Sequence, residues 1–185
     1  MLTIESIWQA KSQQKIFMAL LNCMALPGKI VDLKDNLGSY SALLGVLATL
    51  LDNTVTWSDE DELVNHRDRT LLATPLVPSN KAQFIVKNAT IAPNNHFSPY
   101  LGELTSPEQG ATLILQGNHL GKGNLKLQLS GPGIENTLTI SLDQFDPEWF
   151  KQRYLWNKHF PLGVDMILVD QTQILALPRT THLEW

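Results

Sequence analysis

Cysteine and arginine are both scarce in this sequence. Cys23 is the single cysteine among 185 residues, so the chain forms neither an internal disulfide nor a thiolate metal cluster. The arginines are Arg67, Arg69, Arg153 and Arg179, and the formal net charge is −4. Because proteins that bind nucleic acid neutralise its phosphates with clustered basic residues, we expect no nucleic-acid partner.

Long apolar runs are also absent. The longest, residues 42–51, is about half of the roughly 20 residues that span a bilayer. The first residues, Met-Leu-Thr-Ile-Glu-Ser-Ile-Trp, lack the basic region and apolar core of a signal peptide. We therefore expect a cytoplasmic protein without membrane contact. With 43% apolar and 17% charged residues, the chain can bury a core, and its length fits one domain, 1–185.

Motifs for nucleophilic, nucleotide or metal chemistry are missing as well. No Gly-x-Ser-x-Gly elbow occurs. The glycine-rich stretch 117–123 departs from a phosphate-binding loop, because Gln116 and Gly123 stand where that motif needs glycine and Ser or Thr, and we interpret it as a hairpin connection. Because these motifs are missing, we expect no catalytic residue. We also expect no metal, since no two histidines stand at the spacing of a helical metal pair. The histidines are His66, His96, His119, His159 and His182.

Helices are expected chiefly in the first half of the chain. Helical spacing predicts a first helix within residues 6–24, then a turn at Pro27-Gly28 and a short strand over 29–33. A second helix, 39–51, is apolar nearly all round, which is typical of a helix buried between layers. The expected buried stripe of the first helix consists of Ile16, Phe17, Leu20, Leu21 and Met24.

The next segments are expected to mix strands with short helices. A strand is predicted over 54–57, and Ser58-Asp59-Glu60-Asp61 has the cap and the carboxylates of a helix start, so a short helix should run to about His66. Further strands are predicted over 71–78 and 83–86. One or two helical turns are expected within 96–104.

Strands dominate the last third. They are predicted over 111–116 and 125–129, and a helix should start at Asp146-Pro147-Glu148 and end near Tyr154. Residues 164–169 and 173–177 are expected to pair as a hairpin. Helices that alternate with strands and then give way to hairpins predict an α/β protein with a mixed sheet in three layers.

The two ends of this last hairpin carry the candidate site. Asp165 enters it, and Arg179, Thr180, Thr181 and His182 follow it. Antiparallel pairing places residues near 164–165 opposite those near 177–178, so Asp165 and Arg179 can meet at one edge. Three interpretations stay open: an ion pair that fixes the hairpin, an anion pocket with Arg179 as bidentate donor, and an interface patch.

Several stretches together resemble a known family. Phe-Pro-Leu-Gly-Val-Asp (160–165), the apolar hairpin and Leu-Pro-Arg-Thr-Thr (177–181) resemble the end of the PhnH subunits of bacterial carbon–phosphorus lyase systems. Residues 17–28 resemble that family's opening helix and turn, and 110–115 and 131–134 resemble its central strands. One departure is Met18, where the family commonly has arginine.

The resemblance implies a fold and a role. The fold would be a three-layer α/β/α sandwich resembling the large domain of pyridoxal-phosphate-dependent transferases, without the cofactor. The role would be that of an accessory subunit that works with PhnG, PhnI, PhnJ and PhnL in phosphonate catabolism. With its partners it would move the ribose triphosphate of ATP onto an alkylphosphonate and release adenine. A homodimer is expected for the isolated chain.

Two other functions remain open at this point. The chain would be a small-anion or nucleotide binding module if a pocket forms near Arg179. It would be an independent enzyme if His182 or His159 served as a base.

Overall fold

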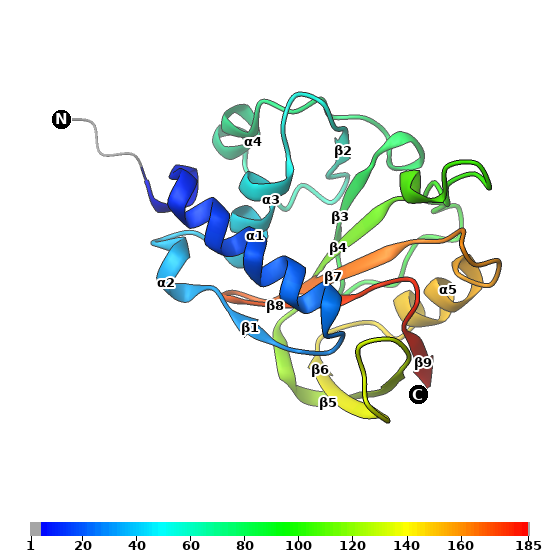
Figure 1. The fold of residues 1–185 in the computed structure, drawn as a ribbon. Helices are drawn as coiled ribbons and strands as arrows, with labels where there is room; N and C mark the ends of the chain where they lie inside the picture. The colour runs from blue at the N-terminus through cyan, green and yellow to red at the C-terminus, as the bar shows by residue number, and fades with distance from the viewer. Residues whose placement is uncertain (1–4, 185) are drawn as a thin grey trace.

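A computed structural model describes residues 5–184. Two β-sheets and five α-helices organise this part of the chain (Figure 1). The helices are α1 (Ala10–Ala25), α2 (Lys34–Leu37), α3 (Ala42–Leu50), α4 (His66–Leu72) and α5 (Glu148–Trp156), with 3-10 turns at Ser6–Trp8, Ser79–Lys81 and Pro107–Gln109. The strands are β1 (Val31–Asp32), β2 (Trp57–Ser58), β3 (Phe84–Asn88), β4 (Thr112–Gln116), β5 (His119–Ser130), β6 (Leu138–Asp143), β7 (Asp165–Val169), β8 (Gln173–Leu177) and β9 (His182–Glu184).

A six-stranded mixed sheet forms the centre of the fold. Its strand order is β1-β8-β7-β4-β3-β2. Strands β2, β3, β4 and β7 run parallel, while β8 is antiparallel to both of its neighbours, β7 and β1. The inner strands are apolar on both faces, as in Leu113-Ile114-Leu115, whose side chains are fully buried. Such runs are typical of strands that are covered on both sides.

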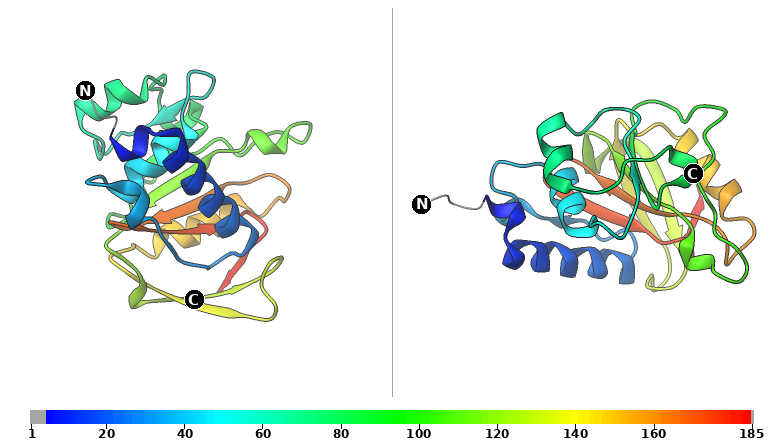
Figure 2. Two further views of the ribbon diagram at one scale, coloured as in Figure 1. Left: turned by 60° about the vertical axis from the view of Figure 1, so that its left-hand side comes forward. Right: turned by 90° about the horizontal axis from the view of Figure 1, so that it is seen from above.

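Different layers cover the two faces of this sheet (Figures 1 and 2). Apolar side chains of α1, α3 and α4 pack with Ile114 and Ile167 into one core. On the other face, Leu113 and Leu168 pack against α5 and the second sheet, whose strand order is β6-β5-β9. The prediction of an α/β protein with a mixed sheet is therefore confirmed. The second outer layer combines one helix with three antiparallel strands, so the expected α/β/α sandwich is correct only in part. Of these three strands, β6 and β9 were not predicted.

The predicted buried stripe of α1 is only partly correct. Ile16 and Leu20 are buried, but Phe17 and Leu21 are 44% and 47% exposed. Cys23, which was not part of the predicted stripe, is buried in the core together with Ile16 and Leu20. Burial raises the pKa of the Cys23 thiol to about 11, with a smaller opposing effect from Lys29, so it stays protonated at neutral pH.

Three predicted elements are wrong. Residues 58–61 start no helix, because the Asp59 carboxylate accepts hydrogen bonds from the amides of a loop, and the helix starts at His66 with the side chain of Asn65 as its cap. Residues 71–78 form no strand: α4 runs to Leu72, and only an isolated bridge links Leu76 to Trp57. Residues 96–104 contain no helical turn.

The glycine-rich stretch 117–123 is not a hairpin connection. It leads from β4 in the large sheet to β5 in the small one. Strand β5 already starts at His119, and its pairing with β6 is interrupted between Leu120 and Leu125. Gly121 and Gly123 have φ angles of 81° and 124° there, which other residues rarely adopt.

The remaining predicted elements are present, with shifted ends. The last hairpin is the most accurate of them, since β7 and β8 match the predicted strands to within one residue. Within residues 5–184, no helix has the length and apolar character needed to cross a membrane.

Candidate functional site

Asp165 and Arg179 meet at the end of the β7–β8 hairpin. Met166 lies opposite Leu177 in the antiparallel pair. Asp165 and the residues that follow Leu177 therefore lie at the same edge of the sheet. Arg179 donates from Nη2 to Oδ2 of Asp165 at 2.8 Å and from Nε at 3.2 Å. Its backbone amide donates to Oδ1 at 2.7 Å. The predicted ion pair is confirmed.

All three nitrogens of the Arg179 guanidinium donate hydrogen bonds within the chain. Its Nη1 donates to the carbonyls of Pro107 and Pro161, at 2.6 and 3.2 Å. The side chain is only 12% exposed. Arg179 therefore ties two loops to the hairpin. This geometry favours the structural interpretation over an anion pocket in which the guanidinium would be a free bidentate donor.

Arg153 holds the segment that follows β8, and sequence reasoning misses it. This arginine of α5 is 2% exposed and donates to the carbonyls of Thr181, Leu177 and Pro178. Burial lowers its pKa to about 10, and the nearby carboxylate of Asp165 opposes this shift, so the guanidinium is charged at neutral pH. The sequence does contain a signal for the burial of Arg153. It stands at helical spacing from Trp149 and Phe150, and all three lie on the buried face of α5.

The other predicted site residues line a groove beside this anchor. The groove has a volume of about 840 Å³, and its lining includes Arg179, Thr180, Thr181 and His182. Thr181 is buried, Thr180 is half-buried and His182 is exposed at the start of β9. Asp165 is not part of the lining. The structure thus brings four of the five predicted residues to one surface, and their role as ligand or interface residues stays a prediction.

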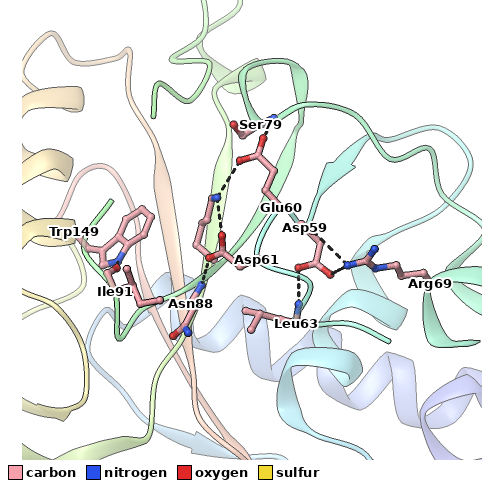
Figure 3. Close-up of polar contacts among 10 residues, drawn as sticks. Asp59, Glu60, Asp61, Leu63, Arg69, Ser79, Asn88, Ile91 and Trp149 are labelled. Carbon is pink, nitrogen blue, oxygen red and sulfur yellow. Dashed lines mark hydrogen bonds and ion pairs between the residues drawn. The ribbon is translucent and has the colours of Figure 1, made fainter. Parts of the chain in front are cut away.

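A second polar cluster lies at the carboxyl end of β3 (Figure 3). The ammonium group of Lys87 donates to Glu60 and to Asp61, both at 3.0 Å. Glu60 also accepts the amide of Ser79 at 3.0 Å, and Asp61 accepts the amide of Asn88 at 2.8 Å. These contacts fasten the loop that follows β2 to the end of β3.

A cavity of about 400 Å³ opens next to this cluster. Its lining includes Lys87, His96, Phe97 and Trp149, and the Lys87 ammonium lies 5.4 Å from the centre of the Phe97 ring. The carboxyl ends of parallel strands are common ligand sites in α/β folds. Here, however, Lys87 already pairs with two carboxylates, so the cluster holds the loop after β2 against the end of β3. Within residues 5–184, no group of three or more His, Cys, Asp or Glu side chains is placed to hold a metal ion.

Replacing Lys87 with methionine is expected to lower the free energy of unfolding by about 1 kcal/mol at neutral pH. The variant loses two ion pairs and leaves Glu60 and Asp61 without their shared cation. The loss is limited because Glu60 is partly exposed. Urea denaturation measures it, with the exposed Lys81→Met as the control.

Acid should remove this difference between wild type and variant. Burial opposes ionisation of Glu60, but hydrogen bonds from the Ser79 amide and from Lys87 outweigh it and hold the pKa of Glu60 below its ordinary value of 4.5. The stabilisation is therefore present above that value and is lost as the pH falls through the lowered pKa. A difference that persists in strong acid would contradict this explanation.

Comparisons with known proteins place the chain in a family. The family model described as bacterial phosphonate metabolism protein (PhnH) matches residues 6–184. The chain is 40% identical over 180 residues to a putative C-P lyase subunit protein HtxG of Stutzerimonas stutzeri, covering 96% of this chain and 88% of the relative. It is 30% identical over 186 residues to alpha-D-ribose 1-methylphosphonate 5-triphosphate synthase subunit PhnH of Rhizobium meliloti (strain 1021), covering 92% and 90%. With a match along nearly its full length, the chain belongs to the PhnH family of bacterial phosphonate metabolism proteins.

Proposed function

We propose that this chain is an accessory subunit of a carbon–phosphorus lyase core complex. Together with partner subunits, it is required to transfer the ribose triphosphate of ATP to an alkylphosphonate, the synthase activity for which the Rhizobium meliloti relative is named. One observation carries the proposal: relatives named as subunits align with 96% and 92% of this chain. The relationship therefore extends over the whole fold rather than over one motif.

The partners and the assembly belong to the same proposal. They are subunits of the PhnG, PhnI, PhnJ and PhnL types, with a homodimer when the chain is isolated and a cytoplasmic location. The isolated chain is proposed to be inactive. In support, the most buried cationic side chains, Arg153, Arg179 and Lys87, direct their donors to acceptors inside the chain rather than to open space.

The fold is proposed to resemble the large domain of pyridoxal-phosphate-dependent transferases and to work without that cofactor. A mixed sheet covered on both faces is compatible with the resemblance. Pyridoxal phosphate binds a deprotonated lysine as a Schiff base. Lys87 is poorly suited to this: burial lowers its pKa, but hydrogen bonds and charge from Asp61 and Glu60 outweigh burial and raise it. The described lysines other than Lys87 are exposed.

The alternative of a small-anion or nucleotide module near Arg179 has weaker support. An anion at Arg179 would have to displace Asp165 or two carbonyls from the guanidinium. Loss of those contacts would detach the loops that they hold.

Co-expression with PhnG-, PhnI-, PhnJ- and PhnL-type subunits tests the proposal. Native mass spectrometry of the tagged, purified chain should show a defined complex of several subunits. Adenine release from ATP in the presence of methylphosphonate should require both this chain and its partners. A chain that stays alone, or that releases adenine by itself, would contradict the proposal.

A further inference from the structure

The groove beside the C-terminal segment has a free strand edge along one wall. Strand β9 is the last strand of the small sheet in the order β6-β5-β9, and within the described residues only β5 pairs with it. All three residues of β9 line the groove, and so do residues of α5 and of the segment after it. The outer edge of a strand presents unpaired amide and carbonyl groups, which match an extended backbone.

Exposed aromatic rings stand on the helix side of this groove. Tyr154 is 60% exposed and Phe160 is 63% exposed, and both line it. Large aromatic side chains of this kind are enriched at protein interfaces, where their burial supplies most of the affinity. An extended segment lying against β9 would cover them.

The groove also carries an excess of positive charge in a chain whose net charge is −4. Among the described residues, Arg153 donates to carbonyls and forms no ion pair, although the nearby carboxylate of Asp165 favours its charged form. Lys158 forms no ion pair among these residues either. Within residues 5–184, Glu184 is the one acidic residue of the lining, while Asp165 already neutralises Arg179.

The floor of the groove contains two buried polar groups without a partner. Nε of Arg153 and Oγ1 of Thr181 have no hydrogen-bond acceptor or donor among residues 5–184. Both residues are 2% exposed and belong to the lining. Both atoms are themselves buried beneath the lining, so an occupant of the groove does not reach them without a rearrangement of that lining.

We propose that this groove binds an extended, acidic segment of a partner subunit, which adds to β9 as a fourth strand of the small sheet. Main-chain pairing at a free edge supplies affinity, and side-chain contacts supply selectivity. Here Tyr154 and Phe160 receive an apolar side chain, and Lys158 receives a carboxylate. The inference rests on the proposed function, because it takes its occupant from the same complex.

A second copy of this chain fits the groove less well. Pairing of two β9 strands around Leu183 would place His182 opposite Glu184 of the other copy. Each copy would still bring its own excess of positive charge from Arg153 and Lys158 into the contact. Like charges brought together at an interface disfavour association, whereas an acidic segment neutralises them.

Two matched double variants of the full chain, one in the groove and one outside it, test whether the groove binds the partner. Tyr154→Ala combined with Lys158→Glu should weaken binding to the purified partner subcomplex at least tenfold, as measured by biolayer interferometry. The control pair is Leu155→Ala with Lys122→Glu. Leu155 is 55% exposed beside Tyr154 and does not line the groove, and Lys122 is exposed toward the other end of β5. The control should stay within twofold of wild type.

Photo-crosslinking identifies the occupant. Benzoylphenylalanine in place of Tyr154 should crosslink to one extended, acidic segment of a partner subunit in the assembled complex. A crosslink to a second copy of this chain, or unchanged affinity of the groove variant, would overturn the inference and leave the proposed function standing. Absence of any complex with the unaltered chain would overturn both. The altered side chains are exposed, and thermal melting verifies that each variant is folded.

Discussion

Replacing Asp59 with alanine is expected to lower the free energy of unfolding by about 3–5 kcal/mol, the usual effect of breaking a buried ion pair. The carboxylate is completely buried and accepts the amides of Leu63 and Val64 at 2.9 and 3.0 Å. It also accepts Nη2 of Arg69 at 2.9 Å (Figure 3). Alanine would leave both amides unpaired and the guanidinium without its counter-charge. Such a loss is a large part of the roughly 5–15 kcal/mol that stabilises a typical domain.

Urea denaturation followed by tryptophan fluorescence measures this effect, and Glu62→Ala is the matched control. Glu62 belongs to the same acidic run but is exposed, so its loss should change stability by less than about 0.5 kcal/mol. Asp59→Asn should fall between wild type and alanine, because an amide oxygen still accepts a hydrogen bond while the charge is lost. Equal effects of Asp59→Ala and Glu62→Ala would show that the buried contacts contribute little.

The acidic run shows why local patterns mislead. Ser58 followed by four carboxylates has the composition of a helix start. The same preference of carboxylates for free amides operates here, but the amides of Leu63 and Val64 belong to a loop. Asn65 then caps α4 by accepting the amide of Asp68. Residue types alone do not distinguish an oxygen that caps a helix from one that closes a loop.

The hairpin at the end of the chain was accessible to sequence reasoning because its geometry is local. Residues 170–172 connect β7 and β8, so antiparallel register fixes which residues face each other. The meeting of Asp165 and Arg179 follows from that register. Their further contacts do not, because Arg179 reaches Pro107 across more than seventy positions of the chain.

Strand β9 and the role of Arg153 depend entirely on tertiary structure. β9 has three residues and pairs with β5, which lies more than fifty positions earlier. Arg153 binds backbone carbonyls, and since every residue has a carbonyl, the sequence does not show which ones are bound. Only the position of an arginine on the apolar face of α5 indicated that it is buried.

Replacing Arg153 with methionine is expected to cost about 3 kcal/mol and to loosen the chain locally, since hydrogen bonds from charged groups contribute about 1.5–3 kcal/mol each. Methionine fills much of the space but donates nothing to the carbonyls of Leu177, Pro178 and Thr181. Against this loss stands a gain. Burial lowers the pKa of Arg153 to about 10, so folding disfavours its charged form at neutral pH, and methionine removes that cost. We expect the three lost bonds to outweigh it.

Hydrogen exchange separates the local effect from general destabilisation. Amides of residues 181–184 should lose protection in Arg153→Met, whereas those of β4, at the centre of the large sheet, should keep more of it. Arg153→Lys should recover less than half of the loss, because an ammonium is a point charge and does not spread over several carbonyls. Arg67→Met is the matched control, since that arginine is 74% exposed. If Arg153→Met were as stable as this control, the burial of the charge would cancel its hydrogen bonds.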